Sequence, residues 1–378
     1  MDMKGGRAHF FDKAAVVVAL WVLIQVTVAM GGEKQVREKV IFDTDTAIFN
    51  DDGAALVMLL RYPERFELLG VTVVAGNHGA DQGAEYMLSI MEMMGCDIPL
   101  FIGARAPMAN SRELARVYEE RYGKITFKGA FGAGESVKPP PGGRFARARP
   151  EQENAVAFLI RTIEENPGEV TVLAIGPMTN LAIALRLRPD LGKMIKRLVF
   201  MGGNARVGGN VTRFAEFNFW FDPEAARAVI HAEIPEKIMF GLDITNHAVL
   251  TKAHFDAIAS VRTPITELFA EDMGAGWPGF YDNPEATGYI WDCLAAGYLI
   301  DPTFVTDQEE VRLEVVTEFS AAYGSSFVPN PGAGSEAARG VSAPTNRVRV
   351  MLNLDFAKFF ALYRDLLTRP VEPPTEPR

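Results

Sequence analysis

Short apolar runs rich in β-branched residues alternate with segments of helical periodicity along most of this 378-residue chain. The runs are continuously apolar, as in strands that are buried on both faces of a sheet. Strands separated by helices imply right-handed crossovers and a mostly parallel sheet. We therefore predict an open α/β fold with helices on both faces. The predicted strands are 39–42, 69–75, 98–101, 170–175, 197–201 and 237–242, and the predicted helices are 52–61, 80–94, 151–165, 179–188, 222–231, 250–260 and 355–367.

A single domain is expected over residues 32–368, because a hydrophobic content of 48% can supply a sizeable core. Two stretches inside it, 104–150 and 324–346, have the composition of loops, and we expect neither to build a core. Each could be a lid over a site or a plain insertion. The Pro-rich tail 369–378 is predicted to be disordered.

The first 31 residues have the layout of a secretory signal. Three basic residues precede the apolar run 14–30, and Ala29 and Gly31 offer small side chains before a cleavage point. The protein is therefore expected to be exported, either to a periplasm or out of the cell. The alternative is a membrane anchor through residues 14–30, since seventeen residues are at the lower limit for a spanning helix.

The formal net charge of −10 argues against a nucleic-acid partner, because phosphate binding needs clustered Lys and Arg. A neutral or cationic small molecule fits this charge better. The two cysteines, Cys96 and Cys293, could pair in an oxidising compartment, but two do not make a disulfide framework.

Four carboxylates lie within Asp43–Asp52, directly after the predicted strand 39–42. Crowded carboxylates repel one another unless a cation or strong donors lie among them. The five histidines and two cysteines show no paired spacing typical of zinc, so a hard, oxygen-binding ion is favoured, calcium first and magnesium second. The alternative is an ordinary loop in which Asp residues cap a helix.

Other polar loops follow neighbouring strands at the same edge of the predicted sheet. Ligands of open α/β sheets bind beyond the carboxyl ends of the strands. We expect the acidic segment and the loops at 76–78, 176–180 and 202–204 to converge there.

Seven short blocks together resemble the nucleoside hydrolase family over about residues 39–367. They are DTD with DD (43–45, 51–52), VVAGN (73–77), AIGPMTNLAIAL (174–185), MGG (201–203), GN (209–210), EFN with DPEAA (216–226) and WD (291–292). The resemblance implies an open α/β sheet with a Rossmann-like core, a bound calcium ion, and a homodimer or homotetramer. It also implies hydrolysis of the N-glycosidic bond of ribonucleosides to ribose and free base.

The resemblance further implies roles for individual residues. The calcium ligands would be Asp45, Asp52, Asp292 and the backbone carbonyl of Ile175, and Asp45 would also be the general base. Catalytic contacts to the sugar would come from Asp51 and Asn218. The residues implied to bind substrate are Asn77, Met201, Asn210, Glu216, Asn218 and Trp291. The residue types suit this chemistry, because a cation activates water, carboxylates stabilise an oxocarbenium-like transition state, and amides pair with hydroxyls.

Several of these residues have structural alternatives. Asn77 and Asn180 could cap the segments that follow them, and Asp222 before Pro223 reads as a helix N-cap. Glu216 and Asn218 would share one face of a strand. Asp292 lies in an apolar helical pattern, where its charge would be unpaired without a cation.

Two departures from the family pattern affect the site. Phe49 lies between the two acidic blocks and could alter how that loop closes. Trp291 stands where relatives that use a histidine acid carry His, so it cannot protonate the leaving base. Tryptophan can stack on a purine, which favours purine nucleosides, with core packing as the alternative. Trp277, Phe280 and Tyr281 could supply further aromatic walls.

Two rival functions are considered. Haloacid-dehalogenase phosphatases also begin with strand-DxD, but their motif continues Gly-Thr, whereas Thr46-Ala47 follow here. A non-catalytic, calcium-dependent nucleoside- or sugar-binding protein on the same scaffold is the other rival.

Overall fold

The computed structural model describes residues 36–46, 49–134, 136–140, 143–276, 283–329 and 345–371. The chain divides at Arg37 and Glu38, and the unit from Glu38 onward carries all the helices and strands discussed below. In the part described, no helix is both long and apolar enough to cross a membrane, and the run 14–30 lies outside that part.

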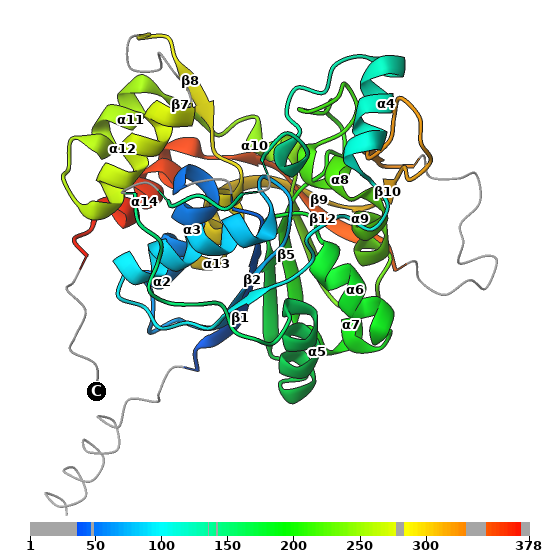
Figure 1. The fold of residues 1–378 in the computed structure, drawn as a ribbon, viewed down its shortest axis with the longest axis horizontal. Coiled ribbons are helices and arrows are strands. Elements are labelled where there is room, and N and C mark those ends of the chain that lie inside the picture. Colours follow the sequence, from blue (N-terminus) through cyan, green and yellow to red (C-terminus); the bar gives the residue numbers. More distant parts are fainter. Residues whose placement is uncertain are drawn as a thin grey trace, which may run out of the picture. The chain divides into compact units, whose positions relative to one another are not determined.

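An eight-stranded sheet in the order β3-β2-β1-β4-β5-β6-β12-β9 forms the centre of this unit (Figure 1). All neighbouring strands are parallel except β9, which runs antiparallel to β12 at one edge. The strands are β1 (Glu38–Thr44), β2 (Phe66–Val73), β3 (Leu100–Ile102), β4 (Val170–Ala174), β5 (Arg197–Met201), β6 (Lys237–Phe240), β9 (Val305–Arg312) and β12 (Arg347–Leu354). The predicted mostly parallel α/β sheet is therefore confirmed.

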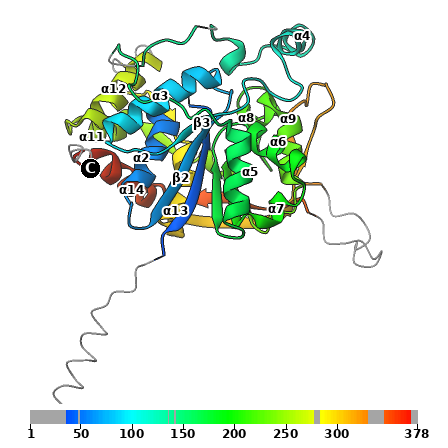
Figure 2. The same ribbon diagram turned by 60° about the horizontal axis from the view of Figure 1, so that its bottom comes forward.

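Helices cover both faces of the sheet, as the alternating pattern predicts (Figures 1 and 2). One apolar cluster joins one face of the sheet to α2 (Ala54–Leu60), α3 (Ala80–Met93), α10 (Leu242–Thr245), α11 (Lys252–Ala259), α12 (Pro264–Gly276), α13 (Asp292–Ile300) and α14 (Phe356–Thr368). A second cluster joins the other face to α5 (Ala155–Glu165), α6 (Thr179–Leu187), α7 (Leu191–Met194) and α9 (Pro223–Ile230).

Residues 104–150 contribute to a third apolar cluster, so the expectation that they build no core is wrong. Helix α4 (Arg112–Tyr122) lies in this stretch, and its Tyr118 is buried with Trp220 of α8 (Phe217–Phe221). The buried surface of this cluster comes largely from aromatic side chains, which the Gly- and Pro-rich composition of the stretch did not indicate. Short elements complete the fold: η2 (Gly129–Phe131), η3 (Pro302–Phe304), and the pairs β7 (Val249–Thr251) with β8 (Thr287–Tyr289) and β10 (Glu314–Val315) with β11 (Ser326–Phe327).

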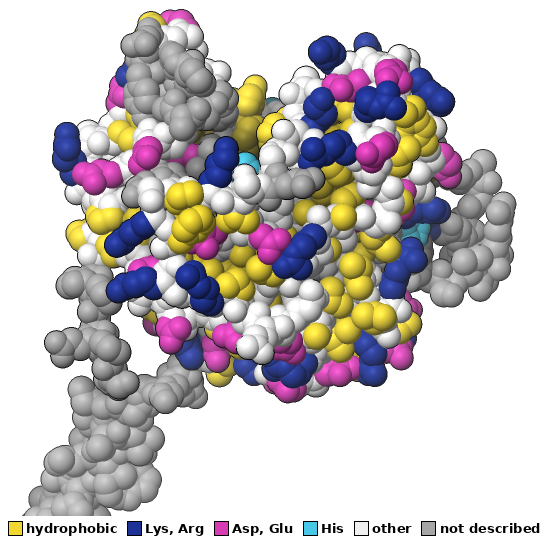
Figure 3. Space-filling view, in the orientation of Figure 1, with side chains coloured by type: hydrophobic (Ala, Val, Ile, Leu, Met, Phe, Trp, Pro, Cys, Tyr) yellow, Lys and Arg dark blue, Asp and Glu magenta, His cyan; other side chains and the backbone are white. Residues whose placement is uncertain are grey.

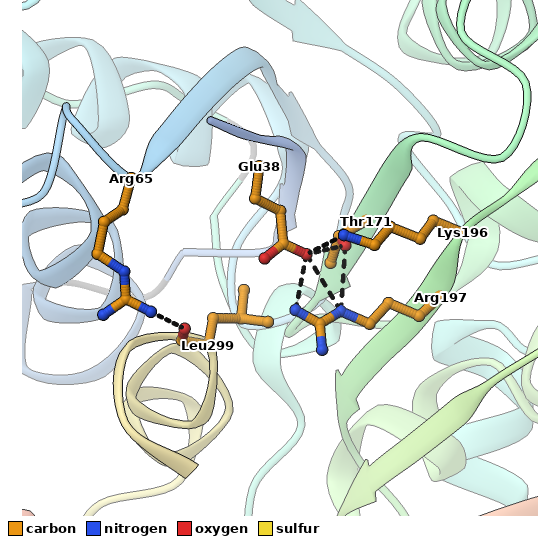
Figure 4. A network of polar contacts seen from close by, with 6 residues as sticks. All are labelled: Glu38, Arg65, Thr171, Lys196, Arg197 and Leu299. Carbon is orange, nitrogen blue, oxygen red and sulfur yellow. Dashed lines mark hydrogen bonds and ion pairs between the residues drawn. The ribbon is translucent and has the colours of Figure 1, made fainter. Parts of the chain in front are cut away.

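A network of polar contacts fixes the amino-terminal ends of the central strands. Glu38 at the start of β1 accepts hydrogen bonds from Thr171 on β4 and from Arg197 on β5, and it pairs with Lys196 (Figure 4). The two positive charges help to hold the pKa of Glu38 below its ordinary value, against the effect of burial. The polar loops predicted to form the site follow the carboxyl ends of the strands, at the opposite edge from this network.

Lys and Arg are interspersed with Asp and Glu on the face drawn in Figure 3. The described residues on this face therefore form no continuous basic field of the kind that phosphate backbones require. Cys96 and Cys293 are both free thiols, so the pairing considered for them does not form.

Candidate functional site

Asp43 lies inside β1, because the strand runs two residues beyond the predicted end at 42. Its Oδ1 accepts hydrogen bonds from Thr72 Oγ1 and from Asn180 Nδ2 at 2.8 Å. Its Oδ2 is buried and has no hydrogen-bond partner among the described residues. Burial raises the pKa of Asp43 to about 6. Asp43 therefore ties β1 to the neighbouring strand β2 and to helix α6, as a support behind the site.

Asp45 follows β1 directly and is fully buried. Its carboxylate accepts the backbone N–H of Asn77 at 2.7 Å and the Asn77 side-chain amide at 3.3 Å. A Cβ at Gly76 would lie 2.0 Å from Asp45 Oδ2, and one at Gly176 would lie 2.8 Å from Asp45 Cβ. Burial and the neighbouring charge of Asp52 raise the pKa of Asp45 well above its ordinary value. Both glycines are needed so that the loops after β2 and β4 can close around this carboxylate.

Asp51 and Asp52 lie in a π-helical turn, η1 (Phe49–Gly53), a rare geometry that often occurs at functional sites. Phe49 is fully buried in the first apolar cluster and so attaches this turn to the core. Asp52 accepts a hydrogen bond from Thr44 Oγ1 at 2.5 Å. The loop that departs from the family pattern thus still brings Asp52 to the end of β1.

Asp51 caps helix α13 from outside that helix. Its Oδ1 accepts the backbone N–H groups of Trp291 at 3.2 Å, Asp292 at 2.8 Å and Cys293 at 3.4 Å. The Cys293 thiol donates in return to the Asp51 carbonyl at 3.2 Å. Burial and the charge of Asp52 raise the pKa of Asp51 to about 7. These contacts fix the start of α13 against the acidic turn.

Asp292 begins α13 and is buried, with 4% of its surface exposed. Burial raises its pKa well above the ordinary value, and so do the charges of four other acids. Those acids are Asp51, Asp52, Asp45 and Glu216. The structure therefore gathers all the carboxylates that the sequence assigned to this site.

Glu216 and Asn218 do not lie on a strand, so the expected strand face is wrong. Residues Phe217–Phe221 form helix α8, and Glu216 is its N-cap. The Glu216 carboxylate accepts the backbone N–H groups of Asn218, Phe219 and Gly203. Burial raises the pKa of Glu216 to about 7. The sequence did not indicate this helix start, because Glu is not among the residues usually preferred at the N-cap.

Asn218 connects the ends of two central strands. Its Nδ2 donates to the carbonyls of Ile175 at 3.0 Å and Met201 at 3.1 Å. Asn210 is exposed, and its Oδ1 accepts the backbone N–H of Phe217 at 3.0 Å. Asn210 and Asn218 are thus both tied to α8, and Asn218 also contacts the Ile175 carbonyl at the end of β4.

Trp291 is half-buried beside Asp51 and packs partly against the core. Its ring lies 5.8 Å from that of Tyr289, at an interplanar angle of 33°. Trp277, Phe280 and Tyr281 lie outside the described residues.

The donor set suits a hard divalent cation, since it consists of carboxylate oxygens and a backbone carbonyl oxygen. Within the described ranges, however, no three acidic, His or Cys side chains are placed together as a ready coordination group. The carboxylates of Asp45, Asp52 and Asp292 are nevertheless close enough for their negative charges to raise one another's pKa. Asp45, Asp52, Asp292 and the Ile175 carbonyl would hold it.

Helix capping was the structural alternative for Asp222 and Asn180, and it is confirmed for Asp222 and wrong for Asn180. Asp222 caps α9 through the backbone N–H of Ala225, as expected. Asn180 does not cap its own helix, because its side chain instead links Asp43 to the backbone N–H of Ala104. Sequence reasoning also missed Thr44, Thr72 and the close approach of Gly76 and Gly176, although glycines directly after two strands could have indicated crowding there.

The family model described as inosine-uridine preferring nucleoside hydrolase matches residues 40–361. The chain belongs to this family. It is therefore an N-glycosyl hydrolase that acts on ribonucleosides, and the phosphatase alternative is not supported. The expected resemblance over about residues 39–367 is confirmed.

Several known proteins are similar to this nucleoside hydrolase. A pyrimidine-specific ribonucleoside hydrolase, RihB, of Escherichia coli O17:K52:H18 is 32% identical over 289 residues, which are 76% of this chain and 86% of that protein. A plant nucleoside hydrolase, PpNRh1, has a TM-score of 0.71 at 24% identity, with 89% of this chain and 100% of that chain covered. An inosine-guanosine nucleoside hydrolase also has a TM-score of 0.71 at 24% identity, with 87% and 98% covered. Both structural matches support the fold.

Proposed function

We propose that this hydrolase cleaves ribonucleosides to ribose and free base in a calcium-dependent reaction, with purine nucleosides preferred. The gathering of Asp45, Asp51, Asp52 and Asp292 at the carboxyl ends of the strands carries this proposal. Buried carboxylates whose charges destabilise one another are suited to a divalent cation.

Calcium, when bound by Asp45, Asp52, Asp292 and the Ile175 carbonyl, would lower the pKa of a water and orient the ribose hydroxyls. Asp45 would accept the proton of the attacking water. Asn77 holds this carboxylate in place through two hydrogen bonds. Asp45 is fully buried, so its carboxylate stays in this orientation next to the metal position.

The sugar would be held by the residues around the carboxylates. Asp51, Asn77, Asn210, Glu216 and Asn218 supply acceptors and donors for hydroxyl groups, and Met201 supplies an apolar wall. Positive charge that develops on the ribose in the transition state would be stabilised by the surrounding carboxylates. The same carboxylates would thus bind the cation and stabilise the positive charge of the transition state.

The purine preference rests on Trp291. Its indole is half-buried at the start of α13, and the exposed ring of Tyr289 lies beside it. A purine offers a larger face than a pyrimidine for stacking on such a pair, and stacking contributes about 1 kcal/mol. A pyrimidine preference is the second candidate, because the similar E. coli protein is named pyrimidine-specific.

Release of free base from inosine, adenosine, guanosine, uridine and cytidine, with calcium or with chelator, tests the function. We expect turnover that chelation abolishes and calcium restores, with kcat/KM highest for a purine. Trp291→Leu should lower kcat/KM for purines more than for pyrimidines. Higher kcat/KM for uridine and cytidine would establish the second candidate. Nucleoside binding without base release would instead support the non-catalytic rival.

We also propose that the protein is exported and that it forms a homodimer or homotetramer. The basic residues before the apolar run 14–30 support export. Mass spectrometry of the mature amino terminus after expression in a Gram-negative host tests cleavage near Gly31, and an uncleaved, membrane-bound chain would establish the anchor. Light scattering of the purified protein tests the oligomeric state, and a monomer would refute it.

A further inference from the structure

Residues 125–131, named the strap from here on, connect two loops of the site. At one end, Thr126 Oγ1 donates to the Asn210 carbonyl at 2.7 Å, and the Thr126 N–H donates to the Val211 carbonyl at 3.0 Å. Phe127 packs on Phe217, with ring centroids 5.0 Å apart. The strap thereby holds the loop that carries Asn210 against α8.

At its other end the strap contacts the backbone that holds Asp45. The Ala130 N–H donates to the Gly76 carbonyl at 2.7 Å. Gly129 has a φ of +51°, and a Cβ there would lie 2.2 Å from the same carbonyl oxygen. The next N–H along that backbone, of Asn77, donates to Asp45. A displacement at Gly129 would therefore move the peptide that holds the carboxylate.

Helix α4 anchors the strap from outside the site. The Glu119 carboxylate accepts the Ile125 N–H at 3.3 Å and pairs with Lys128 at 3.0 Å. Arg112 donates to the Ala130 carbonyl at 3.3 Å. The strap is thus fixed independently of the two loops that it touches, as a positioning element must be.

We propose that the strap is a positioning element of the hydrolase. Its Gly129–Ala130 end sets the position of Asp45, and its Thr126 end sets the position of Asn210. This inference rests on the proposed roles of Asp45 in calcium binding and proton transfer and of Asn210 in sugar binding.

Gly129→Ala tests the first end, with Gly132→Ala as its matched control. Gly132 belongs to the same turn, has a negative φ of −95°, and has no atom closer than 3.6 Å to an added Cβ. We expect Gly129→Ala to weaken calcium binding about tenfold and to lower kcat about a hundredfold, since small misplacements of ligands and catalytic groups have effects of this size. Gly132→Ala should match the wild type in both. Calcium affinity is measured by calorimetry, without substrate.

Thr126→Val tests the second end, with Thr126→Ser as the variant that keeps the hydroxyl. We expect Thr126→Val to raise the KM for nucleosides about fivefold, the effect of one lost hydrogen bond, and to leave calcium affinity unchanged. Thr126→Ser should restore the wild-type KM. Equal losses of calcium affinity in both Gly129→Ala and Thr126→Val would overturn the two-ended role.

Glu119→Ala serves where Gly129→Ala does not fold, because it removes the contacts of Ile125 and Lys128 with α4 at a partly exposed position. Its control is Glu120→Ala, a neighbour that pairs with Arg116. Glu119→Ala should weaken calcium binding about tenfold, as changes to supporting residues do, and equality with Glu120→Ala would overturn the proposal. An inactive wild-type protein that binds no calcium would instead refute the proposed function itself.

Discussion

The side chain of Asp45 is closely surrounded by backbone, and only glycine at two neighbouring positions allows this. The Gly76 and Gly176 backbones leave no space for a Cβ beside it. The side chain is therefore held in one orientation while its charge is destabilised by burial.

Asp45→Asn should lower kcat by about a thousandfold or more, because the amide cannot accept the proton of the attacking water. Base release from the preferred nucleoside measures this. Asp81→Asn is the control, since Asp81 pairs with Arg105 at the surface. Activity retained in Asp45→Asn would remove the general-base assignment.

Thr44 has no role in the sequence-based prediction but holds Asp52 through its hydroxyl. Thr44→Val should weaken calcium binding about tenfold, as loss of a hydrogen bond to a ligand commonly does. Calorimetric titration with calcium measures the change, and Thr44→Ser should restore the affinity. Unchanged binding in Thr44→Val would show that Asp52 needs no such support.

The acidic cluster Asp43–Asp52 was predictable because carboxylates crowded after one strand are a local signal, whereas Glu216 and Asp292 were assigned only through the family resemblance. The partners that hold this cluster were not predictable, since Thr72 lies on β2, Asn77 in the loop after β2 and Asn180 on α6, and these segments meet only in the folded chain. Long-range contacts of this kind leave no spacing in the sequence.

At the scale of elements, α9 depends on one cap. Asp222 accepts the N–H of Ala225, the hydroxyl of Thr179 at 2.6 Å and the N–H of Met108 at 3.0 Å. It therefore joins α9 to α6 and to the loop before α4.

Asp222→Ala should lower the free energy of unfolding by about 2 kcal/mol, because a cap and two buried donors lose their acceptor. Asp222→Asn should lose less. Denaturant unfolding measures both, and kcat of the folded fraction should stay within about twofold. A large loss of kcat with unchanged stability would mean that Asp222 acts in the site.

The six predicted strands all form, since their continuous apolar runs are typical of buried parallel strands. The missed strands β9 and β12 lack such runs. Exposed Thr306, Asp307 and Gln308 make β9 resemble a loop, although it pairs along β12. Polar residues are tolerated there because an edge strand faces solvent.

At the scale of the whole molecule, the acidic site links stability to pH. Asp43 has a pKa of about 6, and Asp51 and Glu216 have pKa values of about 7, whereas unfolded carboxyls titrate near about 4. Between those values the folded chain holds more protons than the unfolded chain. The free energy of unfolding should therefore fall as pH rises from about 4 to 7.

Thermal unfolding in chelator across this pH range measures the effect. We expect Tm to decrease towards pH 7, and calcium to restore it most at the upper end, where the carboxylates are ionised. A Tm in chelator that rises steadily over this range would contradict the prediction.

The antiparallel strand β9 also limits how copies of the chain can associate. A parallel sheet that ended at β12 would present open backbone groups to any other strand. Instead, the exposed edge carries Asp307, Glu309 and Glu310, two of which already pair with Arg206 and Arg347 of the same chain. Two such edges placed side by side would oppose like charges and break those pairs. A homo-oligomer of this hydrolase should therefore not extend the sheet through β9.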